Sequence, residues 1–370
     1  MSQPMRLFLL LLAAPLTFSI SCKGPRNINV DWFIIYKTPG GGKIPNAGRT
    51  FFYLDNKNPV WTQLSGLIGD EKQPLGTTIS QVYSANEAKT FSFMYNDDSP
   101  INNRSDGSRG HAKGVVLSDT KKGFWLVHSA PNFPPTRSYS YPETATKFGQ
   151  TFVCMTVGAD ALAMIGEHLR YIQATPYYST LPDMFKTRYP VLQDIVNKHS
   201  LPRSATIFTK SQLLRTDGGV GFMAFAKHKK YNKDIWVELV APEVRSDLAV
   251  QGWLNGAAGD LNTDCNKQFS VFDIQRISLP NTEFLSSRDH SKWAVGASES
   301  VPVVCVGDMN RQVSQTKRGG GAICFRDSTL WHSFHSLVLQ VEPCPRRSNN
   351  HLRYSLVVLV MLSLRLKAGS

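Results

Sequence analysis

Short runs of β-branched and aromatic residues recur along the chain, and turn residues separate them. This pattern predicts β-strands, which we expect at residues 30–36, 91–95, 114–117, 124–127, 151–157, 235–240, 271–277 and 301–306. Apolar residues spaced three and four apart predict amphipathic helices at residues 160–173, 189–199 and 329–339. Because both kinds of element occur throughout the chain, the pattern predicts a mixed α/β (α+β) fold.

The N-terminus departs from this pattern. Arg6 followed by an apolar run over residues 7–20 is typical of a secretory signal. Small residues at the −3 and −1 positions predict cleavage before Cys22, which assigns residues 1–21 to the signal peptide. A short membrane anchor is the alternative, but the run is short for a membrane span.

The other end is also unusual. Residues 345–370 form a divergent tail, in which the apolar stretch 355–364 is followed by Arg365 and Lys367. A glycolipid-anchor signal needs an unbroken apolar end, which these cations interrupt. The stretch is too short for a membrane-spanning helix, so we expect no stable membrane span.

Charge suggests a class of partner. The 370 residues include 41 Lys and Arg against 28 Asp and Glu, a net charge of +13. Residues 22–344 hold all the acids and 35 of the bases, which leaves them at +7, and eight of the nine His lie there too. This stretch becomes strongly basic in acid, which suits a polyanionic partner. With 19% charged and 42% hydrophobic residues, the composition excludes a disordered, collagen-like or coiled-coil protein.

Six cysteines are present and none forms a CxxC pair, which argues against a zinc ribbon or a thioredoxin-type motif. An even count behind a secretory signal predicts three disulfides, but the spacing alone leaves fifteen pairings open. A glycosylation sequon at Asn103-Arg104-Ser105 fits the same route.

The most informative feature is a pattern that occurs twice. In each copy a Lys lies two residues after a His, a strand follows, and an Asn comes after the chain has turned back. The two copies are His111, Lys113 and Asn132, and His290, Lys292 and Asn310. The spacing of two places the His and Lys on one face of an extended segment. The alternative is a pair of exposed basic strands with no joint role.

If the two copies face each other, two imidazoles, two ammonium groups and two amides converge, and such a set suits phosphodiester cleavage. Lysines and amides can hold the non-bridging oxygens as their charge grows. A neutral His can attack phosphorus and form a phospho-histidine, while a protonated His donates to the leaving oxygen and then activates water. The lysines supply the positive charge, so the hypothesis requires no metal and no cofactor.

These motifs belong to a wider set of markers. They include Val30-Asp31-Trp32-Phe33, Tyr95-Asn96-Asp97, Gly110-His111-Ala112-Lys113-Gly114, Pro131-Asn132-Phe133-Pro134-Pro135, Asp289-His290-Ser291-Lys292-Trp293 and Cys305-Val306-Gly307-Asp308-Met309-Asn310-Arg311. With these markers, residues 22–344 resemble the deoxyribonuclease II family over nearly their whole length. The resemblance implies a phospholipase D-like pseudo-dimer that cuts DNA at acid pH without a divalent metal and leaves 3′-phosphate and 5′-hydroxyl ends. It also implies a lysosomal location, with secretion as a second destination.

Carried over residue by residue, the resemblance implies that the catalytic groups are His111, Lys113, His290 and Lys292. Asn132 and Asn310 stand where the wider superfamily has its supporting, phosphate-binding Asn. The implied halves are residues 22–158 and 159–344, each with one motif. The implied disulfides are Cys22–Cys154, Cys265–Cys344 and Cys305–Cys324. The sequence makes no prediction of oligomeric state.

Three further features have two interpretations each. His128 could orient a catalytic group or be a satisfied structural His. The run Lys227–Lys230 with Lys233 could contact DNA phosphates or be solvated surface, and Arg318-Gly319-Gly320-Gly321 could bring backbone amides to a phosphate or be a turn. The competing functions are a catalytically weak DNA-binding or toxin-like secreted protein and another phosphodiesterase on the same scaffold.

Overall fold

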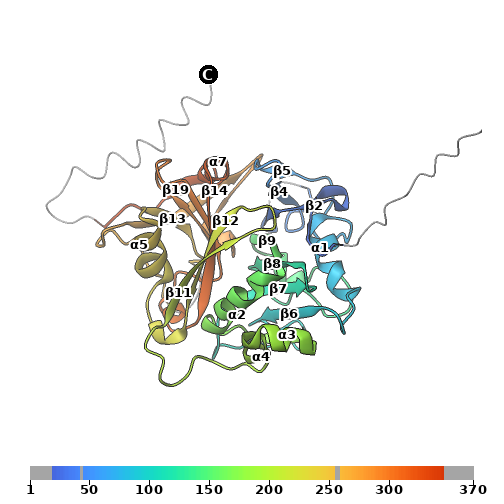
Figure 1. The fold of residues 1–370 in the computed structure, drawn as a ribbon. Coiled ribbons are helices and arrows are strands. Elements are labelled where there is room, and N and C mark those ends of the chain that lie inside the picture. Colours follow the sequence, from blue (N-terminus) through green and yellow to red (C-terminus); the bar gives the residue numbers. More distant parts are fainter. Residues whose placement is uncertain (1–18, 42–44, 255–258, 346–370) are drawn as a thin grey trace, which may run out of the picture.

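Two β-sheets dominate the computed structural model, which describes residues 19–41, 45–254 and 259–345 (Figure 1). Most of the predicted signal peptide and nearly all of the predicted tail lie outside the described residues. The described strands of the first sheet run in the order β10 (Pro176–Thr180), β6 (Phe91–Asn96), β7 (Lys113–Ser118), β8 (Lys122–His128), β9 (Gln150–Gly158), β3 (Trp32–Lys37), β4 (Phe51–Asp55) and β5 (Thr62–Gln63).

The second sheet is built from the later part of the chain. Its order is β11 (Thr209–Arg215), β12 (Gly221–Lys227), β18 (Gly320–Arg326), β17 (Val303–Gly307), β16 (Trp293–Gly296), β13 (Leu248–Gln251), β14 (Val271–Leu279) and β15 (Thr282–Leu285), with β19 (Val338–Val341) also paired to β14. A separate ribbon joins β1 (Cys22–Lys23) to β2 (Asn29–Val30).

The two sheets share an order of strands. The run β6-β7-β8-β9-β3-β4 in the first corresponds to β13-β16-β17-β18-β12-β11 in the second, and every neighbouring pair in both runs is antiparallel. Strand β7 begins at Lys113 and strand β16 begins directly after Lys292, so one His–Lys motif stands at the start of each. Sheet membership changes between Thr180 and Thr209, later than the proposed division at 158/159, which stays a prediction about domains.

A single apolar cluster draws buried residues from both sheets. Trp32 of β3 packs against Phe325 of β18 at 5.5 Å between ring centroids, and Tyr36 of β3 contacts Trp293 of β16. Helix α2 lies between β9 and β10 of the first sheet in sequence but packs against β11 and β12 of the second (Figure 1). The helices are α1 (Pro74–Tyr83), α2 (Leu162–Tyr171), α3 (Asp183–Arg188), α4 (Pro190–Val196), α5 (Ala241–Val244), α6 (Val313–Thr316) and α7 (Ser328–His335).

The mixed α/β class is confirmed, but two expected elements were wrong. The strand expected at 235–240 is a π-helical turn, Trp236–Val240, that continues into α5. Its side chains are almost all buried, and an apolar run without periodicity does not distinguish a buried strand from a buried helix. The helix expected at 329–339 ends at His335, and β19 begins three residues later because Val338 and Val341 pair with β14.

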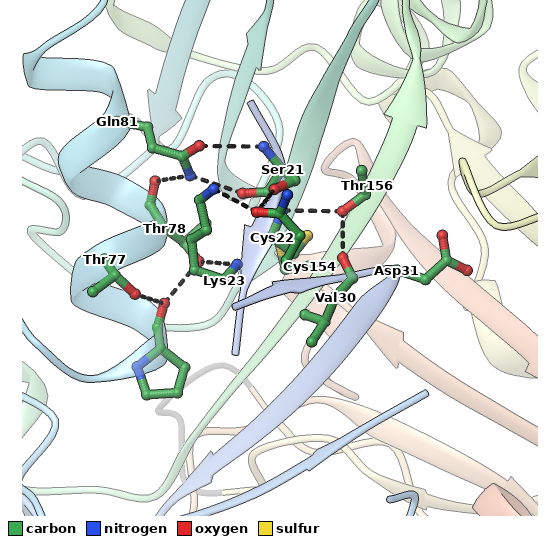
Figure 2. Close-up of a disulfide and its surroundings, with 12 residues drawn as sticks. Ser21, Cys22, Lys23, Val30, Asp31, Thr77, Thr78, Gln81, Cys154 and Thr156 are labelled. Atoms are coloured by element: carbon green, nitrogen blue, oxygen red, sulfur yellow. Dashed lines mark hydrogen bonds between the residues drawn. A yellow bond between two sulfur atoms is a disulfide. The ribbon is translucent and has the colours of Figure 1, made fainter. Parts of the chain in front are cut away.

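The start of the described chain is held tightly (Figure 2). The backbone N–H of Ser21 donates to the side chain of Gln81, whose amide donates back to the Ser21 carbonyl. The backbone N–H of Cys22 donates to Thr156 Oγ1 at 3.0 Å. Disulfides join Cys22–Cys154, Cys265–Cys344 and Cys305–Cys324, the pairing that the resemblance implied.

Candidate active site

The two His–Lys motifs meet where the sheets adjoin. The rings of His111 and His290 lie 6.5 Å apart between centroids, with their planes at 68°. His111 is buried, with 7% of its surface exposed, and His290 is half-buried. The expected approach of the two histidines is therefore present in the structure.

Each motif is held by a glycine from the other sheet. The backbone N–H of His111 donates to the Gly319 carbonyl at 2.8 Å, and that of His290 donates to the Gly149 carbonyl at 3.0 Å. Gly149 directly precedes β9 and Gly319 directly precedes β18, which are corresponding strands. A Cβ at Gly149 would overlap the Asp289 carboxylate, so only glycine permits this approach.

The two lysines lie in different surroundings although each is 1% exposed. Lys113 Nζ contacts the carboxylate of Asp97 and lies 2.9 Å from Asp98 Oδ2. Burial disfavours its charge, but the two carboxylates outweigh burial and raise the pKa of Lys113. Lys292 Nζ contacts His290 Nδ1 at 3.2 Å, and burial together with Lys113 lowers the pKa of Lys292 to about 7.

Hydrogen bonds distinguish the two imidazoles. His111 Nδ1 lies 2.7 Å from the carbonyl oxygen of Asp308, which can only accept, so the proton sits on Nδ1 and Nε2 carries a lone pair. His290 Nδ1 accepts from the Lys292 ammonium, which places the proton of the neutral ring on Nε2. The pair therefore offers one bare and one proton-bearing Nε2.

Electrostatics disfavour charge on both rings. Burial, followed by Lys113 and Lys292, holds the pKa of His111 well below its ordinary value. Burial, Lys292 and His111 do the same to the pKa of His290, while Asp98 acts in the opposite sense on both. Lowered imidazole pKa values of this kind are common at catalytic centres.

Buried carboxylates support the motifs, and sequence reasoning assigned them no role. Asp289 accepts hydrogen bonds of 2.5 Å from the hydroxyls of Tyr36 and Ser291. Asp308 accepts from the backbone N–H of Gly321, and burial raises the pKa of its carboxyl to about 7. Asp289 directly precedes His290 and Asp308 lies two residues before Asn310, but Tyr36 and Gly321 come from other strands.

The asparagines make no recorded contact with the histidine rings. Asn132 adopts a left-handed conformation and its amide donates to the Ser99 carbonyl at 3.0 Å, so it fixes the loop that carries Asp98. Asn310 is buried beside the polar pocket that contains Lys227 and Gln315. Their phosphate-binding role stays a prediction.

His128 is buried between two aromatic rings. Its imidazole stacks on Phe152 at 5.6 Å and meets the edge of Phe133 at 5.4 Å. Burial, followed by Lys113 and Lys292, holds its pKa well below the ordinary value. It therefore lies within electrostatic reach of the motif lysines, in packing that fits a structural role.

Some residues of the remaining basic and glycine-rich motifs are buried, and others lie on the surface. Lys227 is 1% exposed, whereas Lys229 and Lys230 are exposed. Gly319 supplies the carbonyl that binds His111, and Gly320 begins β18. The glycine run thus positions a motif residue through a backbone carbonyl. The sequence had suggested a different role, in which its backbone amides approach a phosphate. Asn103 of the sequon is exposed.

One aromatic residue at the site was missed altogether. Trp253 has φ 47°, rare for a bulky residue, and its ring meets His290 at 4.8 Å and Phe148 at 4.5 Å between centroids. Trp253 and Phe148 are both half-buried. A single Trp after a strand carries no sequence signal of such a position.

Other features are absent from the described part of the chain or lie elsewhere. No group of three or more His, Cys, Asp or Glu among the described residues could hold a metal ion. No helix there has the length and apolar character needed to cross a membrane. A surface hollow of about 740 Å³ lies near Asp119 and Met184, and none of its lining residues belongs to the motifs.

Comparison with known proteins gives a consistent result. A family model described as Deoxyribonuclease II matches residues 21–344. Cell-death-related nuclease 7 of Caenorhabditis elegans is 46% identical over 344 residues, which cover 93% of each chain. Deoxyribonuclease-2-alpha of Mus musculus is 35% identical over 337 residues, 88% of this chain and 94% of that protein. Plancitoxin-1 of Acanthaster planci is 32% identical over 335 residues, 88% of this chain and 93% of that one.

Proposed function

This chain belongs to the deoxyribonuclease II family, and from that membership we propose that it is a metal-independent acid endonuclease that cuts DNA through its two histidines. The observation that carries the proposal is the approach of His111 to His290, each with a buried lysine two residues later. The corresponding strand order of the two sheets supports a phospholipase D-like pseudo-dimer, in which each half contributes one motif.

The hydrogen bonds support a division of roles between the two rings. His111 Nε2 carries a lone pair and attacks phosphorus, forming a P–N bond as the bond from phosphorus to the 5′ oxygen breaks. His290, protonated on both ring nitrogens at acid pH, gives its Nε2 proton to that oxygen, which leaves as a 5′-hydroxyl while the ring becomes neutral. His290 then takes a proton from water, whose oxygen attacks phosphorus and breaks the P–N bond to leave a 3′-phosphate.

The lysines take the place of a metal ion in this scheme. Lys113 and Lys292 both lie close enough to the histidine pair to lower the pKa of each ring. Their positive charge offsets the charge that grows on the non-bridging oxygens. The predicted secretory signal and the three disulfides fit an oxidising route to the lysosome.

Plasmid digestion at pH 5 in excess EDTA, followed by end-group analysis, tests the proposal. We expect nicking that EDTA leaves unchanged, with 3′-phosphate and 5′-hydroxyl ends. Loss of cleavage in EDTA that Mg²⁺ or Ca²⁺ restores would contradict the metal-free mechanism. DNA binding without cleavage would favour the alternative of a DNA-binding protein on the same scaffold.

A further inference from the structure

Two fully buried lysines outside the motifs occupy corresponding places in the two sheets. Lys37 is the last residue of β3 and pairs with Gln150, the first residue of β9. Lys227 is the last residue of β12 and pairs with Gly320, the first residue of β18. Lys37 is 0% exposed and Lys227 is 1% exposed, which is unusual for lysine.

Both ammonium groups bind backbone carbonyls, and neither forms an ion pair among the described residues. Lys37 Nζ donates to the carbonyls of Thr146, at 3.1 Å, and Phe148. Lys227 Nζ donates to three carbonyls, those of Gln315, Thr316 and Arg318, at 3.2, 2.8 and 2.6 Å. A lysine ammonium has three donors and can gather several carbonyls at once.

The loops that these lysines close are the loops that hold the motif histidines. The loop bound by Lys37 ends at Gly149, whose carbonyl accepts from the backbone of His290. The loop bound by Lys227 ends at Gly319, whose carbonyl accepts from the backbone of His111. Each lysine therefore acts on the histidine of the opposite sheet.

We propose that Lys37 and Lys227 are a matched pair of positioning residues, Lys37 for His290 and Lys227 for His111. This proposal rests on the function proposed above, because it states that the two lysines serve to position the histidine rings that carry out that function. A displacement of about 1 Å at a reacting group can cost on the order of 100-fold in rate. Removing a buried ammonium also takes a hydrogen-bond donor away from each of these carbonyls.

The charge state of the pair fits an enzyme that works in acid. Burial lowers the pKa of Lys37 to about 7, with Asp289 opposing and Arg49 adding to the effect. Burial lowers the pKa of Lys227 to about 8, and Asp234 opposes it. Both lysines are then protonated and bind their carbonyls most strongly at acid pH.

The test combines hydrogen exchange with steady-state kinetics on the full chain. The variants are Lys37→Met and Lys227→Met, together with Lys37→Gln and Lys227→Gln, which keep an amide donor and protect the fold. Lys23→Met is the matched control, because Lys23 is also a buried lysine whose Nζ donates to a carbonyl, but it lies in the N-terminal ribbon.

We expect a crossed pattern. Lys37→Met should speed amide exchange in the peptide that contains His290 and leave the His111 peptide protected, and Lys227→Met should do the reverse. In Lys37→Met and in Lys227→Met, kcat should fall about 10- to 100-fold, with KM changed less than about threefold. The kcat of each Gln variant should lie between that of the Met variant and that of the unsubstituted protein. Lys23→Met should match the unsubstituted protein.

Two results would overturn the inference. One is exchange that rises equally at both histidine peptides in the Met and Gln variants, since that is general loosening of the fold. The other is kcat equal to that of Lys23→Met. If the unsubstituted protein itself cuts no DNA, the proposed function fails instead, and the exchange pattern still decides whether the lysines position the two histidines.

Discussion

His111 and His290 face each other from different sheets, and the backbone of each is bound by a carbonyl that belongs to the sheet of the other. The site is consequently a property of the interface between the sheets. Neither motif is held in place by its own sheet alone, and displacement of either ring disturbs the same cluster of charges.

The first prediction follows from this shared site. His111→Ala and His290→Ala should each lower kcat/KM by at least about 1,000-fold, and the double variant should be little worse, because groups that act as a unit are not additive. His332→Ala is the control, since His332 is exposed on α7. Retention of about half the activity in each single variant would mean two independent sites.

The pH profile gives the second prediction. Because burial and the lysines hold both imidazole pKa values below 6.5, the protonated ring that the leaving group needs becomes populated only as pH falls. The value of kcat/KM at fixed ionic strength should therefore rise from pH 8 towards pH 5. An optimum at pH 7.5 or above would be incompatible with this mechanism.

Asp98 gives a sharper form of that test. Its carboxylate raises the pKa of both histidines, so Asp98→Asn should move the basic limb of the profile to lower pH. Asp183→Asn is the control, because Asp183 is exposed on α3. A limb at unchanged pH in Asp98→Asn would show that these histidines do not set the profile.

Trp253 supplies the third prediction. The ring of this half-buried residue lies beside His290 and can stack on a base next to the scissile phosphate, a contact worth about 1–3 kcal/mol. Trp253→Ala should raise KM for a single-stranded oligonucleotide by about tenfold, and Trp253→Phe should restore most of the affinity. On a substrate that lacks the base at the cleavage site, the KM values of both variants and of the unsubstituted protein should become similar. If the ratio of KM between Trp253→Ala and the unsubstituted protein were the same on this substrate as on the intact one, stacking would be contradicted.

The N-terminus supplies the fourth prediction. Cys22 is 0% exposed and its N–H is bound to Thr156, so cleavage directly before it would bury a new ammonium and remove the two hydrogen bonds between Ser21 and Gln81 (Figure 2). We therefore expect signal cleavage upstream of Ser21. The sequence alone had predicted cleavage further along the chain, directly before Cys22. N-terminal sequencing of the secreted protein decides between the two positions.

The sequence predicted the parts of the site that lie close together in the chain. The spacing of His and Lys, and its repetition, was enough to single out the four motif residues, whose shared chemistry stays a prediction. Strands β6 to β9 were visible because β-branched and aromatic residues mark strands buried on both faces.

Long-range partners were beyond reach of the sequence for a physical reason. Lys227 stands in a run of basic residues that is equally typical of solvated surface, and only the pairing of β12 with β18 places its ammonium among three carbonyls. Asp289 similarly depends on Tyr36, which comes from the other sheet. Residues 235–240 show the same limit, since tertiary burial decided between strand and helix.

The last prediction concerns stability in acid. His168 is buried against Trp125 at 4.9 Å between ring centroids, and burial lowers its pKa to about 3, below the value of about 6.5 in an unfolded chain. Between these two pH values the unfolded chain binds a proton that the folded protein does not. As the pH is lowered below 6.5, the free energy of unfolding therefore decreases by about 1.4 kcal/mol per pH unit, which amounts to about 2 kcal/mol at pH 5. His168→Met removes this contribution, so urea unfolding at pH 7 and pH 5 should differ by about 2 kcal/mol less than in the unsubstituted protein. His332→Met, at an exposed position, is the control, and an equal pH dependence in all three proteins would mean that His168 takes up its proton within the fold.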